Sequence, residues 1–139
     1  MQDGKEESQI LMDSVLPFAE KMLSEHGEFF PYGGAIDKGG EVVSVAAYDG
    51  NEQPPSSEVI SMLQKAFQSA ASNGEYRATA LVYDVIIQLP SGDKSDSLAI
   101  ELDHESGYSV VVYIPYTVEK GQIHYGQISA SAGQGNVFY

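Results

Sequence analysis

The feature that most constrains the fold is the stretch from residue 76 to residue 116, which reads as consecutive antiparallel strands. Two segments with turn chemistry, Pro90–Asp93 and Glu105–Gly107, divide it. The strands are therefore predicted at Tyr76–Leu89, Ser97–His104 and Tyr108–Tyr116. A chain with this stretch must build an antiparallel sheet, and the other segments must cover or extend it.

Each predicted strand presents two rows of side chains, because side chains alternate across a strand. In the first strand the row that contains Leu81 is almost wholly apolar, while the opposite row carries Asp84 near its middle. We expect an apolar core face and a mixed face of small, aromatic and acidic residues. In the register that we assume, the mixed face brings together Asp84, Glu101, Asp103, Val111 and Tyr113.

Two further segments show the apolar spacing of helices, at about residues 8–26 and 56–72. Pro17 interrupts the first pattern and predicts a kink or a break there. Between the helices we expect an irregular edge strand around residues 29–36 and a returning strand at 41–48, and a last strand is predicted at 122–131. This order, α-β-β-α-β-β-β(-β), predicts an α+β fold: a two-layer sandwich in which two helices cover an antiparallel sheet of five to six strands.

Length and charge limit the classes of function. A chain of 139 residues predicts one domain, and the polar residues 1–7 and the glycine-rich residues 132–139 are expected to be flexible termini. The formal net charge of −13 leaves no basic footprint for nucleic acid or for an anionic membrane, but favours a basic protein partner. The chain has no cysteine, its start does not resemble a secretory signal, and no apolar run approaches transmembrane length, so we expect a cytoplasmic protein.

Candidate chemistry is sparse, and we assign no catalytic residue, no metal site and no cofactor. Asp84 and Glu101 could form a carboxylate pair, but nothing in the sequence indicates the pocket that a general acid needs. Asp103 and His104 are neighbours in a strand and should point to opposite faces. A ligand pocket is conceivable where aromatic residues gather, although core packing is the stronger interpretation of them. Its residues would be Phe29, Phe30, Tyr32 and His104.

Several short segments together resemble a group of small acidic bacterial proteins of uncharacterised function. The segments are Leu16–Ala19, Gly27–Ala35, Ala47–Gly50 and Gly107–Tyr113, and the resemblance runs from about the first helix to Tyr116. These motifs read as structural, so the resemblance implies no catalytic residue. In size and composition alone, the chain is also similar to immunity proteins that neutralise toxins.

We therefore predict a non-enzymatic protein-binding module that engages a basic partner through the mixed sheet face, with an immunity-type role as its most specific form. One alternative is a small-molecule-binding protein or enzyme that uses a pocket near Phe29–Tyr32 and His104. Another is a homodimer that packs its mixed sheet faces together.

Overall fold

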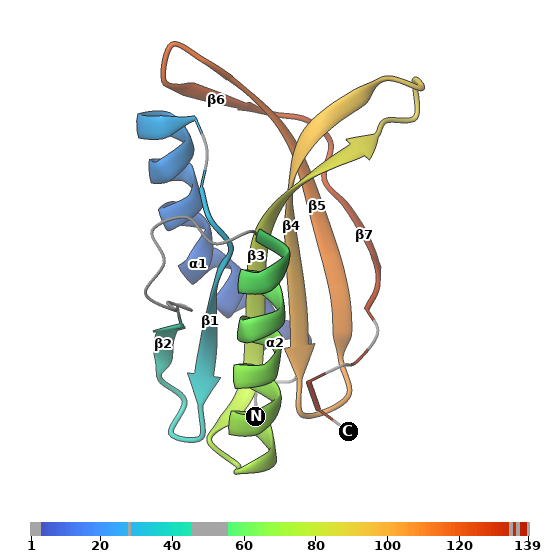
Figure 1. The fold of residues 1–139 in the computed structure, drawn as a ribbon. Coiled ribbons are helices and arrows are strands. Elements are labelled where there is room, and N and C mark those ends of the chain that lie inside the picture. Colours follow the sequence, from blue (N-terminus) through green and yellow to red (C-terminus); the bar gives the residue numbers. More distant parts are fainter. Residues whose placement is uncertain (1–3, 28, 46–55, 134, 136, 139) are drawn as a thin grey trace.

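The computed structural model describes residues 4–27, 29–45, 56–133, 135 and 137–138, which form helices α1 and α2 and strands β1 to β7 (Figure 1). The helices are α1 (Gly4–His26) and α2 (Ser56–Ser72). The strands are β1 (Tyr32–Asp37), β2 (Val42–Val45), β3 (Tyr76–Gln88), β4 (Lys94–His104), β5 (Ser109–Glu119), β6 (Gln122–Tyr125) and β7 (Ser129–Ala132).

The strand pairs of the described residues are all antiparallel. Their spatial order is β2-β1-β3-β4-β5-β6, and β7 also pairs with β5. The predicted α+β class and element order are confirmed, and the sheet formed by the described residues has 7 strands where five to six were expected. The last predicted strand, 122–131, is present as two short strands separated by residues 126–128. The returning strand ends at Val45 within the described residues, and its predicted positions 46–48 lie outside them.

The two helices lie on opposite faces of the sheet, α2 in front of β3 and α1 behind it in the view of Figure 1. Even-numbered β-strand residues such as Ala80 and Ile100 pack with Leu11 and Leu23 of α1. The odd-numbered Leu81 packs with the apolar side of α2. The expectation that both helices cover one face was therefore wrong, because both rows of β3 are apolar enough to be buried.

Residues near both ends of the chain belong to helices, strands or the core. Helix α1 already begins at Gly4, runs through Pro17 without a break, and buries Glu7. Near the other end, Ala132 belongs to β7, and Val137 packs with Val59, Leu63, Phe67 and Leu81 in what we call the α2 cluster. Flexible termini at 1–7 and 132–139 stay a prediction, and positions 1–3, 134, 136 and 139 lie outside the described part. Neither described helix combines the length and apolarity needed to cross a membrane.

The glycine pair in β1 lets both helices approach the sheet. A Cβ atom on Gly33 would lie 2.6 Å from Cζ of Phe67 in α2 and 2.7 Å from the carbonyl oxygen of Ala80. A Cβ atom on Gly34 would lie 2.6 Å from Cγ1 of Val15 in α1. Successive strand residues point to opposite faces, so each glycine makes room for a different helix. The pair marks a close approach on both sides of β1.

We expect Gly34→Ala to lower the free energy of unfolding by about 1–3 kcal/mol, because the new methyl group overpacks the α1 side. Val15→Ala removes the obstructing atom, so the double variant should be more stable than the sum of the two single changes predicts, by about 0.5–3 kcal/mol. Gly33→Ala is the matched comparison, because its backbone clash with Ala80 cannot be relieved by trimming a side chain. Urea denaturation of the variants measures these energies, and strict additivity for Gly34 and Val15 would contradict this packing.

Candidate functional site

Four of the predicted binding residues share one face of the sheet, on the side where α2 lies. In the strand register Leu81 is opposite Glu101, Glu101 is opposite Val111, and Ala99 is opposite Tyr113. Helix α2 packs mainly against β3 and β1, and β4 and β5 continue beside it (Figure 1). We call this surface the acidic face, formed by Tyr83, Glu101, Asp103, Ser109, Val111 and Tyr113.

The acidic face is hollowed into a pocket of about 270 Å³, and Gln64 of α2 contributes to its wall. The Tyr83 hydroxyl donates to Oε2 of Glu101 at 2.6 Å, and the Ser109 hydroxyl donates to Oδ1 of Asp103 at 2.7 Å. Asp103 is only 8% exposed, whereas Val111 and Tyr113 are partly exposed. The pocket therefore combines two carboxylates that are held by hydrogen bonds with partly exposed apolar and aromatic side chains.

The carboxylates of this pocket favour a cationic guest. Burial raises the pKa of Asp103, and the nearby charge of Glu101 raises it further against the lowering effect of the Ser109 hydrogen bond. A cation placed between the two carboxylates would relieve this repulsion. A Lys or Arg side chain could lay its stem on Val111 and Tyr113 and place its charged end at the carboxylates. In the described part of the chain, no group of three or more His, Asp or Glu residues is placed to hold a metal ion.

Asp84 does not belong to the acidic face, which corrects the register assumed from the sequence. Asp84 is opposite Leu98 in the β3–β4 ladder, so it shares the face that α1 covers farther along the strands. Its Oδ1 accepts a hydrogen bond from the Tyr116 hydroxyl at 2.9 Å. A shift of one residue exchanges the two faces of a strand, and Asp84 and Glu101 consequently point to opposite sides. The carboxylate pair suggested by the sequence is not formed.

The residues of the predicted ligand pocket do not converge on one site. Phe29 is buried against Tyr32, and the Tyr32 hydroxyl donates to the Val15 carbonyl of α1, so these aromatics serve core packing. Phe30 is 52% exposed. His104 pairs with Ala78 near the other end of the β3–β4 ladder and faces α1. As predicted, His104 and Asp103 diverge.

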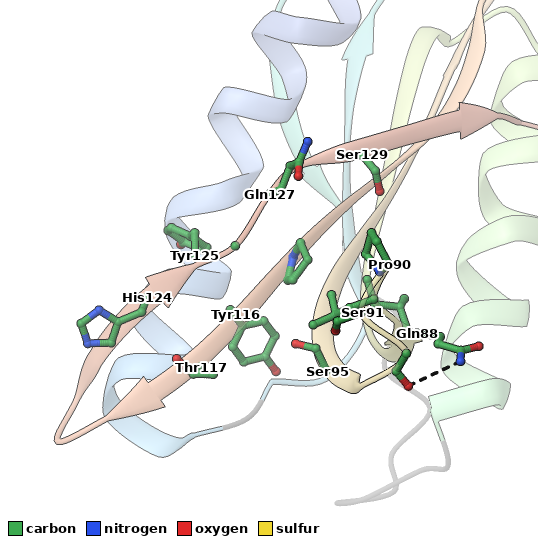
Figure 2. A pocket seen from close by; sticks show the side chains of 15 residues that line it. Gln88, Pro90, Ser91, Ser95, Tyr116, Thr117, His124, Tyr125, Gln127 and Ser129 are labelled. Carbon is green, nitrogen blue, oxygen red and sulfur yellow. Dashed lines mark hydrogen bonds between the residues drawn. The ribbon is translucent and has the colours of Figure 1, made fainter.

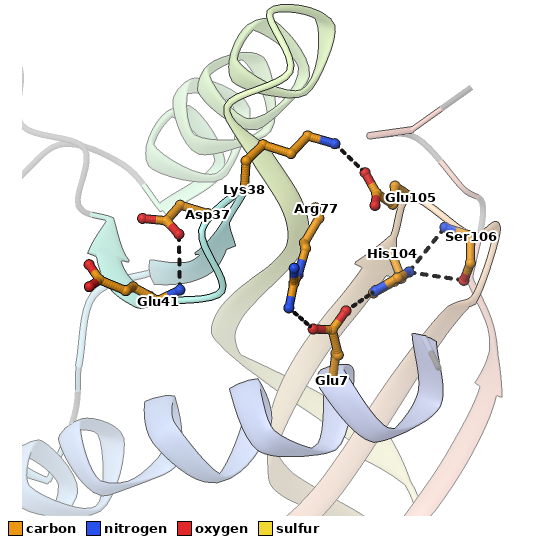
Figure 3. Close-up of polar contacts among 8 residues, drawn as sticks. All are labelled: Glu7, Asp37, Lys38, Glu41, Arg77, His104, Glu105 and Ser106. Atoms are coloured by element: carbon orange, nitrogen blue, oxygen red, sulfur yellow. Dashed lines mark hydrogen bonds and ion pairs between the residues drawn. The ribbon is translucent and has the colours of Figure 1, made fainter. Parts of the chain in front are cut away.

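His104 instead joins a buried polar network beneath the start of α1 (Figure 3). Its Nε2 lies 2.7 Å from Oε1 of Glu7, and the other Glu7 oxygen forms an ion pair with Arg77. The Ser106 amide donates to Nδ1 of His104 at 3.0 Å. That bond occupies the Nδ1 lone pair, so Nε2 carries the proton that is donated to Glu7. The Ser106 hydroxyl lies 2.9 Å from the same Nδ1. Because the Ser106 amide already occupies the Nδ1 lone pair, Nδ1 is poorly placed to take a proton from this hydroxyl as a general base. The network ties α1 to β3 and β4.

A second concavity, which sequence reasoning missed, opens between the β3–β4 and β5–β6 hairpins (Figure 2). Its volume is about 1030 Å³, and we call it the fork groove. Its lining is mainly apolar and includes Ile87, Leu89, Pro90, Pro115, Tyr116 and Tyr125.

Comparison of the chain with protein-family models, with curated proteins and with solved structures returned no match. The resemblance to small acidic bacterial proteins therefore stays a prediction. The functional interpretation depends on the geometry of the two concave surfaces.

Proposed function

We propose that this protein is a non-enzymatic binding module that engages a basic protein partner through the acidic face. The observation that carries the proposal is that Glu101, Asp103, Val111 and Tyr113 line one concave pocket in a chain of net charge −13. Opposite charges speed the encounter of two proteins, and the two carboxylates of the pocket can then hold one basic side chain. Neutralisation of a basic toxin, as immunity proteins achieve it, is the most specific form of this proposal.

The partner contact would combine a buried centre with a charged anchor. Val111 and Tyr113 supply an apolar and aromatic surface, which is typical of the central residues of interfaces. Tyr83 and Ser109 fix the orientation of the two carboxylates through hydrogen bonds, so little side-chain entropy remains to be lost on binding. These features favour a protein side chain over a freely hydrated ion.

The proposal predicts that Glu101→Gln combined with Asp103→Asn weakens partner binding at least about tenfold, because both charges are lost while the shape is kept. The protein is immobilised and exposed to a lysate of its native host, retained basic proteins are identified, and the affinity of the purified partner is then measured for both proteins. Asn can still accept the Ser109 hydrogen bond, so the fold should persist.

The matched control replaces two exposed carboxylates outside the acidic face, Asp93→Asn and Glu119→Gln. It changes the net charge by the same amount, so it should alter binding far less than the double change in the pocket. Equal losses in both proteins would show that only overall charge matters and would refute a specific site. Light scattering on the purified protein tests the alternative of self-association: a dimer that the pocket variant dissociates would make a second copy the partner.

A further inference from the structure

The fork groove exists because two strand ladders continue after the ladder between them has ended. Pairing of β4 with β5 stops at Ser97 and Pro115. Beyond that point β3 still pairs with β4 as far as Lys94, and β5 pairs with β6 as far as Glu119. Figure 1 shows the two hairpins diverging at this end of the sheet. Within the described residues, positions 94–96 and 116–119 therefore each have one strand edge without a partner strand.

Backbone geometry shows which groups these edges present. The Gly126 amide donates to the Pro115 carbonyl at 2.7 Å, so Pro115 turns its backbone polar groups toward β6. Backbone groups alternate in direction along an antiparallel strand, and Tyr116 and Val118 consequently turn theirs into the fork. The same alternation along β4, on the opposite side of the fork, directs the backbone groups of Lys94 and Asp96 toward the fork.

Two carboxylates lie beside the fork, Asp84 and Asp96, and Asp84 accepts a hydrogen bond from Tyr116, which lines the groove. Asp96 lies close enough to Tyr116 and Asp84 for its carboxylate to raise the pKa of both, in addition to the effect of burial. The groove between the edges is mainly apolar. The free edges are three to four residues long, so at about 3.3 Å per residue they match an extended segment of roughly four residues.

We propose that the fork groove binds an extended peptide segment of a partner protein by strand addition. The segment carries apolar side chains that enter the groove and a Lys or Arg side chain that meets Asp84 and Asp96. Main-chain hydrogen bonds to the free edges supply affinity, and the groove reads alternate side chains. This inference is independent of the acidic face, because it uses other residues and the other end of β4 and β5.

The test uses a phage-displayed library of random ten-residue peptides, followed by synthesis of the selected peptides. We expect selected sequences that carry apolar residues at alternate positions and include a Lys or Arg. N-methylation of alternate peptide amides should weaken binding at least about 100-fold, because it removes the donors and blocks strand pairing. Binding that survives N-methylation would indicate a side-chain pocket and overturn strand addition, as would the absence of any selected peptide.

A matched pair of protein variants locates the contact. Val118→Pro deletes the amide that faces the fork without removing a bond to β6, and Val118→Ala removes most of the same side chain but keeps the amide. Peptide binding should weaken about tenfold more in Val118→Pro than in Val118→Ala, with folding checked by circular dichroism. Equal affinities, or a homodimer that Val118→Pro dissociates, would overturn the proposal. Glu101→Gln with Asp103→Asn should leave peptide binding unchanged, so failure here is distinguishable from failure of the acidic face.

Discussion

Glu7→Gln is expected to lower the free energy of unfolding by about 3 kcal/mol, which is the cost of breaking a buried ion pair by removing one partner. Glu7 is 5% exposed and His104 is 6% exposed. Water therefore cannot replace the polar contacts that are lost with the carboxylate. A glutamine could still accept from His104, but its amide group would then meet the Arg77 guanidinium, and two donors would face each other. Urea denaturation at neutral pH measures the difference.

The pH dependence provides a second readout. Burial raises the pKa of Glu7, but the hydrogen bonds from His104 and Arg77 and the Arg77 charge outweigh burial, so the pKa is lowered from its ordinary value of 4.5. A lowered pKa adds stability above the unfolded pKa, and this stability is lost as the pH falls through the folded pKa. The stability gap between wild type and Glu7→Gln should therefore be full at pH 7 and shrink as the pH falls below about 4.5.

Glu25→Gln is the matched control, because Glu25 is an exposed carboxylate on the same helix. Its Oε2 lies 3.9 Å from Nε2 of His26. Exposed pairs contribute little, so the control should change the free energy of unfolding by less than about 1 kcal/mol. If Glu7→Gln and Glu25→Gln have equal effects, the network in Figure 3 does not anchor α1.

Much of the fold could be predicted because its signals are local. Turn residues between alternating runs define β3, β4 and β5, and helical spacing defines α1 and α2. The side of the sheet that each helix covers could not be predicted, because Ala80 and Leu81 belong to opposite rows of β3 and both rows are apolar. A strand that is buried on both faces reads as a nearly continuous apolar run, which loses the alternation that would assign a face.

The candidate site could be predicted only in part for the same reason. Glu101 and Asp103 lie on one strand, so their common face follows from the alternation of side chains alone. Asp84 lies on another strand. Whether Asp84 shares a face with Glu101 depends on the pairing register of β3 and β4, which the sequence does not encode locally. Glu7 and His104 are 97 positions apart, and the polar start of the chain gave no signal that Glu7 would be buried.

Phe67→Ala should have an effect at least as large as that of Glu7→Gln, with an expected loss of about 3–5 kcal/mol. Phe67 is 1% exposed, and its ring meets that of Tyr76 edge-on at a centroid distance of 6.4 Å. It is the largest buried side chain of the α2 cluster and lies against Gly33, which has no side chain that could fill the resulting cavity. Thermal or urea unfolding measures the loss.

Phe18→Ala is the comparison on the other helix, because Phe18 is 49% exposed and contacts Tyr32 edge-on. Its loss should cost no more than about 1.5 kcal/mol. Since the two helices are packed by separate clusters on opposite faces, Phe67→Ala should also speed amide hydrogen exchange more in α2 than in α1. Equal acceleration of amide exchange in both helices would mean that both clusters open together. A loss of unfolding free energy no greater than that of Phe18→Ala would contradict the packing of α2 on β1 and β3.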